Sequence, residues 1–187
     1  MQAPTARLWA TFLMGVWLMG TICTAIVAAE NFFIVDPLLT ARPNEVFASN
    51  VEKLGGAQKT HDLLYYFSSE LNRLYFQYWN LAQLIIGIAT LWLVVRVPAS
   101  DKPKWTIVAM LGIVLFLTVL ITPRIISVGR ALDFVPRVPP PDGLRTFGLL
   151  HATYTVFDGI LMILGILVTI WLVKGNEQHG KVPVFGG

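Results

Sequence analysis

The sequence predicts an all-α, polytopic membrane protein, a bundle of four transmembrane helices with extended extracytoplasmic helices. Of its 187 residues, 55% are hydrophobic and 13% are charged. The mean hydropathy of +0.64 is too high for a water-soluble domain of this length. The apolar segments are spread along the whole chain, and no polar stretch is long enough to fold alone. We therefore expect one membrane domain over residues 1–187.

Four apolar segments are long enough, or nearly so, to cross a bilayer, which requires about 20 apolar residues in a helix. They are residues 8–29, 78–95, 106–122 and 147–173. The first segment ends in Val27-Ala28-Ala29, which is similar to a signal-peptidase site. Because its apolar run is longer than the core of a signal peptide, we expect it to be a membrane helix.

The segment between the first two spans predicts helices outside the bilayer, over residues 44–77. Residues 44–54 favour a short helix that a glycine pair ends. After Thr60, apolar residues recur every three or four positions, which is typical of an amphipathic helix. No helix breaker separates this stretch from the second span. We therefore expect one helix over residues 60–95, roughly 54 Å long, whose first half lies outside the membrane core or along its surface.

The third span predicts a similar extension. Its apolar run ends at Thr122, and Pro123 follows. Because helical spacing continues to Asp133, we expect Pro123 to kink the helix rather than end it. We expect the helix to end at Pro136 and the prolines of residues 139–141, where polyproline geometry takes over.

Positive charge is denser on one side of the four spans. Short segments on this side carry six of the basic residues: Arg7, Arg96, Lys102, Lys104, Lys174 and Lys181. The other eight are spread over much longer loops. Because Lys and Arg in short loops favour the cytoplasmic side, we expect both termini in the cytoplasm. The expected location is the bacterial inner membrane, with the lipid bilayer as the surroundings.

Charge and motifs argue against several function classes. The net charge is +3, but the basic residues are scattered, so we expect no nucleic-acid partner. The sequence has no glycine-rich phosphate loop, HExxH pair, CxxC pair or nucleophile elbow. We therefore expect no enzymatic activity, no catalytic residues and no metal site. The one cysteine, Cys23, cannot form an intrachain disulfide.

Polar residues within the second and fourth spans recur at helical spacing. Asn80 and Gln83 share a face with Gly87 and Thr90, and the fourth span carries a matching stripe of His151, Tyr154, Thr155, Asp158 and Met162. Polar groups at membrane depth are costly, so they usually face other helices or a cavity. The spacing predicts an intramembrane polar seam of Asn80, Gln83, Thr155 and Asp158.

Asp158 lies about twelve residues into its span, where a carboxyl group is costly unless it is paired or protonated. One interpretation is a proton relay, an ion site or the counter-ion of a ligand. The other is an interhelical hydrogen bond to Asn80, Gln83 or a threonine hydroxyl that locks the bundle. No second acid and no basic residue accompanies Asp158 within the spans, and both interpretations stay open.

His151 lies near the expected outer end of the fourth span. Its imidazole could bind the iron of haem b or the magnesium of a chlorophyll-type pigment. A bis-histidine haem would need His61 as its partner. The alternative is an ordinary hydrogen-bonding role. His151 and Asp158 are seven residues apart, about 10 Å along a helix, so they could contact a common ligand but not each other.

A second polar cluster is expected at the outer membrane interface. Its members are Glu70, Arg73, Arg124, Arg130 and Asp133. The extended helices would bring these groups to one level, where they could form a salt-bridge network. Binding of anionic lipid headgroups is the functional alternative.

Five short motifs carry a resemblance to a known family. They are Gly-Val-Trp-Leu-Met-Gly at 15–20, Glu-Leu-Asn-Arg at 70–73, Phe-Gln-Tyr-Trp-Asn at 76–80, Thr-Pro-Arg-Ile at 122–125 and Phe-Gly-Leu-Leu-His at 147–151. With them the chain resembles, over nearly its whole length, a bacterial four-helix integral membrane family of unknown function. Eukaryotic relatives of that family include a transmembrane protein associated with platinum-drug resistance. The resemblance implies the architecture and the importance of Asn80 and His151, but no substrate.

Three functions are consistent with these residues. The first, which we expect, is a non-catalytic integral membrane subunit or accessory protein that docks on a larger complex of membrane protein subunits. The second is a small transporter or ligand-binding bundle that uses Asp158 and the Asn80 face. The third is a haem- or pigment-binding electron-transfer subunit that uses His151.

Overall fold

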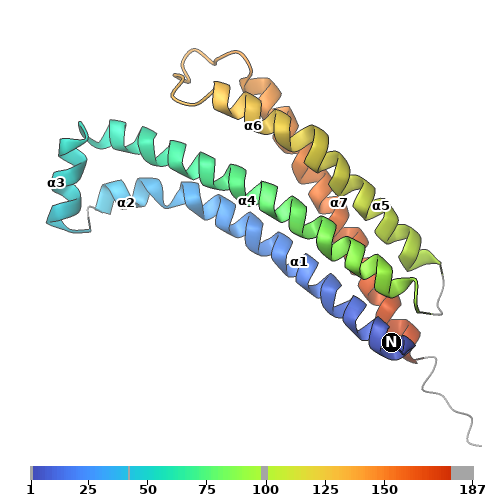
Figure 1. Cartoon of the computed structure of the whole chain (residues 1–187). Helices are drawn as coiled ribbons and strands as arrows, with labels where there is room; N and C mark the ends of the chain where they lie inside the picture. The colour runs from blue at the N-terminus through green and yellow to red at the C-terminus, as the bar shows by residue number, and fades with distance from the viewer. Residues whose placement is uncertain (1, 42, 98–100, 178–187) are drawn as a thin grey trace, which may run out of the picture.

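The computed structural model describes residues 2–41, 43–97 and 101–177, and Figure 1 shows their arrangement. Lys181, which we used to orient the chain, lies outside the described residues. Four helices are long and apolar enough to cross a membrane. The fold class is therefore confirmed as an all-α polytopic bundle. In chain order the elements are α1 (Ala3–Phe33), α2 (Val35–Ala41), α3 (Glu45–Lys53), α4 (Ala57–Val94), α5 (Lys102–Phe116), the π-helical turn η1 (Leu117–Ile121), α6 (Thr122–Ala131) and α7 (Leu144–Glu177).

The four long helices pack as a four-sided bundle. Helix α1 contacts α4 and α7, and α5 contacts the same two helices from the opposite corner. Helices α4 and α7 are thus diagonal to each other. We call the end with the start of α1 and the end of α7 the terminal end, and the end with α2, α3 and α6 the arm end (Figure 1).

The terminal end is closely packed. Helix α1 contributes Ala6, Ala10, Met14 and Trp17, spaced every three or four residues and almost completely buried. They pack with buried residues of α5 and α7, among them Ile107, Met110, Val114, Leu161 and Val168. The small residues of α1 allow the helices to approach closely, and the larger ones fill the space between them.

Helix α4 continues through the expected membrane interface without a break. It begins three residues before the predicted start at Thr60 and ends at Val94. The short helix α3 also lies where the sequence predicts it. Asn44 caps its start, where the side-chain oxygen accepts from the Phe47 backbone N–H at 2.8 Å. The chain then turns at Gly55 and Gly56, whose φ angles of 94° and 91° favour glycine.

Two helix ends differ from the sequence prediction. Helix α1 continues past Ala29 to Phe33, and the unpredicted helix α2 follows it. Helix α6 ends at Ala131 rather than at Pro136, so that prediction was wrong. The Leu132 and Asp133 N–H groups form tight-turn hydrogen bonds to the last carbonyls of α6, and Phe134 has a φ of 58°. Helix α6 therefore ends before Pro136 is reached.

Pro123 lies within a continuous helical segment, because the backbone widens just before it. The five residues of η1 form a π-helical turn, and the Thr122 N–H bonds to the Leu117 carbonyl five residues earlier. A proline has no N–H and crowds the preceding turn, and a π-helical turn is one way to accommodate it. Thr122 is buried in this arrangement, and its hydroxyl contacts α4.

Candidate functional site

Asn80 joins three helices in the interior of the bundle. Its side chain is completely buried. The amide nitrogen donates to the Thr122 hydroxyl at 2.9 Å, and the amide oxygen accepts from the Tyr154 hydroxyl at 2.7 Å. Asn80 thus connects α4 to α6 and, across the diagonal, to α7. These bonds satisfy three polar side chains that would otherwise be costly at this depth.

Gln83 lies one turn further along α4 and is also completely buried. The amide orientation that satisfies its surroundings turns the oxygen toward the indole N–H groups of Trp17 and Trp79, which donate at 3.1 Å each. The amide nitrogen then faces acceptors, and the Asp158 carboxyl group lies within its reach. Gln83 therefore connects α1, α4 and α7.

The position of Trp79 requires a glycine on α1. A Cβ atom on Gly20 would lie only 2.1 Å from Cη2 of the Trp79 ring. Since real Cβ atoms do not approach so closely, the observed position of the ring requires glycine here, and any side chain would displace the ring. The ring rests on Gly20 while its N–H is oriented by Gln83.

Two buried side-chain atoms in the described helices differ from this well-bonded interior, because they have no hydrogen-bond partner. Among the residues that the structure describes, the buried side-chain atoms without a hydrogen-bond partner are Oγ1 of Thr21 and Oδ1 of Asp158. Buried polar atoms are nearly always bonded, so each exception needs an explanation. The two atoms come from different helices, α1 and α7.

Thr21 and Asp158 line the same cavity, a cleft of about 310 Å³ between α1, α4 and α7. Helix α7 contributes His151, Tyr154, Thr155 and Asp158, one face at helical spacing. Helix α1 contributes a face that includes three alanines, Ala25, Ala28 and Ala29. The small side chains of α1 leave room for the cleft opposite the larger groups of α7.

The α4 wall of the cleft is mainly aromatic. It consists of Asn72, Phe76 and Trp79, and Phe32 of α1 adds a further ring. Phe76 and Tyr154 lie edge to face, with their ring centroids 5.2 Å apart. Tyr154 thus lines the cleft while its hydroxyl bonds to Asn80, which ties the cleft wall to the packed interior.

A smaller hollow of about 110 Å³ adjoins the cleft toward the arm end. The cleft and the hollow share Phe32, Asn72, Phe76, His151 and Tyr154. Asn72 holds α1 and α4 together at this level. It donates to the Ala28 carbonyl at 2.8 Å and accepts from the Asn31 amide at 2.7 Å.

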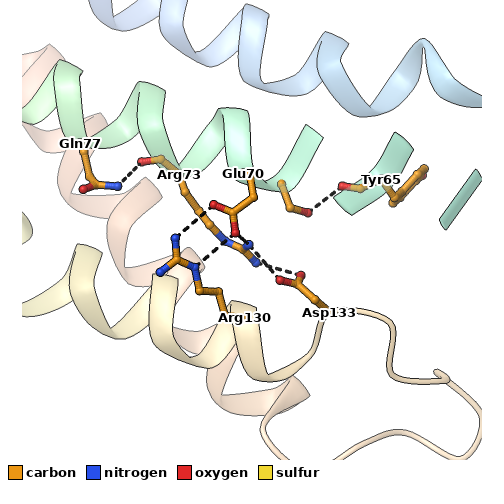
Figure 2. Close-up of polar contacts among 7 residues, drawn as sticks. Tyr65, Glu70, Arg73, Gln77, Arg130 and Asp133 are labelled. Atoms are coloured by element: carbon orange, nitrogen blue, oxygen red, sulfur yellow. Dashed lines mark hydrogen bonds and ion pairs between the residues drawn. The ribbon is translucent and has the colours of Figure 1, made fainter. Parts of the chain in front are cut away.

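Arg73 lines the small hollow and is the centre of an ion-pair network (Figure 2). The Arg73 guanidinium donates to both carboxylate oxygens of Asp133 at 2.9 Å and also to Glu70. Arg130 forms two further bonds to Glu70, at 3.1 and 3.2 Å. This network connects the extended part of α4 to the end of α6. Arg73 is 9% exposed, whereas Arg130 is 59% exposed.

Four of the five residues of the expected outer cluster thus meet in one network. Arg124 does not join them, and its side chain is exposed on α6. The opposite charges of the four are paired with each other, so the structure shows the arrangement expected for salt bridges. Whether lipid headgroups also bind there stays a prediction.

The polar seam is present with one exchange of residues. Asn80, Gln83 and Asp158 lie together, but Thr155 is exposed, and its hydroxyl donates to the His151 carbonyl of its own helix. Tyr154 takes its place in the buried contact with α4. The helical stripe of α7 contains both residues, and sequence alone does not show which of the two neighbours faces inward.

His151 and His61 do not face each other. His151 lines the cleft and the small hollow, and its ring stacks on Phe147. His61 lies eleven residues before Asn72 on α4, about 16 Å along the helix. It stacks on Tyr65 and lies 3.4 Å from oxygens of Asp36 and Asp62. This pair therefore does not form a bis-histidine site here. Ligation of haem or a pigment by His151 alone stays a prediction.

Thr21 and Trp79 were missed as site residues in the sequence. For Thr21 a signal existed, because Thr21, Thr24, Ala25 and Ala28 form a small, partly polar stripe at helical spacing on α1. No such signal marks Trp79, because a tryptophan near a span end is also typical of the membrane interface.

Comparison with known proteins finds no relative of this chain. No family model, no curated protein and no solved structure matches the chain. The resemblance to the four-helix membrane family therefore stays a prediction. In residues 2–41, 43–97 and 101–177, no group of three or more His, Cys, Asp or Glu side chains is placed to hold a metal ion.

Proposed function

We propose that this protein is a small transporter or ligand-binding bundle whose site is the cleft between α1, α4 and α7. One observation carries the proposal: Thr21 and Asp158, whose side chains each hold a buried oxygen without a hydrogen-bond partner, line this same cleft. Leaving a buried polar atom unbonded costs about 1–3 kcal/mol. A ligand that bonds to these two side chains would recover part of this free energy, and such local losses of stability are typical of functional sites.

The position of the cleft supports this proposal. Asp158 is fourteen residues from the start of α7, about 21 Å along a helix of 34 residues. It therefore lies near the middle of its helix, as substrate sites of membrane transporters commonly do. The adjoining hollow, which Arg73 also lines, extends the cavity toward the arm end. We propose this side as the direction of entry.

Cysteine labelling in proteoliposomes tests the proposal. In a Cys23→Ser background, Ala25→Cys and Thr155→Cys place thiols on the cleft wall. Their chain neighbours Ile26 and Val156 are 56% and 61% exposed on the outside of the bundle and supply matched lipid-facing controls. The thiolate that reacts with N-ethylmaleimide forms in water, so cleft thiols should react about tenfold or more faster than their neighbours. Equal, slow labelling at all four positions would refute a water-accessible cleft.

The proposal includes an orientation in the membrane. Arg7, Arg96, Lys102, Lys104 and Lys174 all belong to the terminal end or to its connecting loop. By the positive-inside tendency we place this end in the cytoplasm of a bacterial inner membrane and the arm end outside. Labelling of a single cysteine in the α3–α4 turn by an impermeant maleimide, in intact cells compared with inverted vesicles, checks this orientation. Preferential labelling in inverted vesicles would reverse it.

A second candidate function is that of an accessory subunit in a larger membrane complex. The projecting arm favours it, because Phe33, Val46 and Leu54 are exposed there although they are apolar. In this case a membrane protein should co-purify at a stoichiometric ratio in mild detergent. Replacement of Val46 and Leu54 by serine should release that protein. A chain that is stable and monodisperse alone would argue against this function.

A further inference from the structure

We infer that the ligand of the α1–α4–α7 cleft is a small organic cation, an ammonium group that carries apolar substituents. This inference rests on the proposed ligand-binding function and specifies the class of ligand. Three properties of the cleft carry it: the charge of its wall, its aromatic side chains and its size.

The charge of the cleft wall favours a cation. Asp158 supplies a carboxyl group to the wall, and Thr21 supplies a hydroxyl group. Among the described residues that line the cleft, none is lysine or arginine. Arg73, which follows the cleft residue Asn72 in the chain, is held by Asp133 and Glu70. An acid without a basic partner, in surroundings of low dielectric constant, attracts a positive ligand and repels an anion.

The aromatic side chains specify the kind of cation. Phe32, Phe76, Trp79 and Tyr154 line the cleft together with Asp158. Aromatic rings beside a carboxylate are typical of sites for ammonium groups, which gain from cation–π contacts and from apolar contact of their substituents. Trp79 and Tyr154 are also preorganised, since Gln83 orients the indole and Asn80 orients the phenol. A metal ion would instead need several oxygen, nitrogen or sulfur ligands at close range.

The size of the cleft limits the ligand to a small molecule. A volume of about 310 Å³ lies at the lower end of the range of small-molecule sites. Ala25, Ala28 and Ala29 form the opposite wall and leave apolar space for substituents on the ammonium group. The hydroxyl of Thr21 can accept a hydrogen bond from a primary, secondary or tertiary amine.

Protection from labelling tests this inference with choline as the probe. Its neutral isostere, 3,3-dimethylbutan-1-ol, has the same shape without the charge. The reporter is Ala25→Cys in the Cys23→Ser background, and Ile26→Cys is the matched control outside the cleft. Choline should protect the reporter from N-ethylmaleimide at a concentration about tenfold lower than the neutral alcohol, the factor expected of one desolvated cation–π and carboxylate contact. Neither compound should protect Ile26→Cys.

Two substitutions at Asp158 complete the test. Asp158→Asn should remove the difference between choline and the alcohol, whereas Asp158→Glu, which keeps the charge, should retain it. Equal protection by both compounds in the unsubstituted cleft, or an unchanged preference in Asp158→Asn, would overturn the cationic ligand and leave the ligand-binding function intact. A reporter that labels no faster than Ile26→Cys would refute the ligand-binding function itself, and the inference with it.

Discussion

The two ends of the bundle differ in how closely their interior is packed. At the terminal end, apolar residues such as Ala10, Met14, Ile107 and Val168 fill the space between four helices with essentially no exposed surface. Toward the arm end the same helices leave a cleft and a smaller hollow, both lined mainly by apolar side chains with a few polar groups among them. One chain thus combines a closely packed half with an open half.

The boundary between the two halves is polar but fully bonded. Asn80 and Gln83 lie between the packed residues and the cleft, and their bonds reach α1, α6 and α7. Thr21 and Asp158, whose side chains each hold a buried oxygen without a partner, line the cleft. We conclude that bonded polar residues hold the fold and that the unbonded ones are available to a ligand. This distinction yields the following predictions.

The largest effect is expected at Asn80. Asn80→Ala removes both interhelical bonds and leaves the Tyr154 hydroxyl buried without a partner, so it should lower the free energy of unfolding by about 3 kcal/mol. Reversible unfolding in mixed micelles measures this change. Leu81→Ala is the control, because Leu81 is 55% exposed on the outside of the bundle. A loss at Asn80 no larger than at Leu81 would contradict a structural role for the seam.

The next effect is expected at Gly20, with Gly15 of the same helix as the control. Gly20→Ala places a methyl group in the Trp79 ring, so it should cost about 2 kcal/mol through displacement of the ring. No atom lies within 4 Å of a Cβ added to Gly15, so Gly15→Ala should be neutral or slightly stabilising. Thermal unfolding followed by circular dichroism compares them. Equal effects would show that Trp79 does not depend on Gly20.

A smaller effect separates the two arginines of the ion-pair network. Arg73 is almost buried and bonds to two acids, so Arg73→Gln should lower the free energy of unfolding by about 1.5 kcal/mol. Arg130 is largely exposed and its charge is screened by salt, so Arg130→Gln should have a much smaller effect, and only at low salt. Unfolding at low and at high ionic strength tests both predictions. If the two variants lowered the free energy of unfolding equally, the two arginines would have the same environment.

Much of the fold follows from local properties of the sequence. The four spans, the long helix α4 and the short helix α3 depend on apolar periodicity, an N-cap and a glycine pair, which a single chain displays directly. The end of α6 at Ala131 does not follow from these properties, because the carboxylate of Asp133 leaves the helical path and bonds to Arg73, sixty residues away. Long-range bonds of this kind leave no local pattern.

For the same reason, only part of the candidate site could be predicted from the sequence. Asp158 and His151 are conspicuous because charged and ionisable groups are rare at membrane depth. The partner surface on α1 is less conspicuous, since its stripe of threonines and alanines is similar to many small-residue helix faces. Only the packing of α1 against α4 and α7 shows that these residues enclose a cavity with Asp158.

The stability of Asp158→Asn tests the central distinction most directly. Asparagine has the same shape and can keep a bond to Gln83, so only the charge and one acceptor are changed. If Asp158 serves a ligand, the free energy of unfolding without ligand should stay within about 0.5 kcal/mol of the original or rise slightly, since a buried carboxylate oxygen without a partner is lost. A decrease of about 1.5 kcal/mol or more would show that the carboxyl group holds the bundle together, and it would contradict our account.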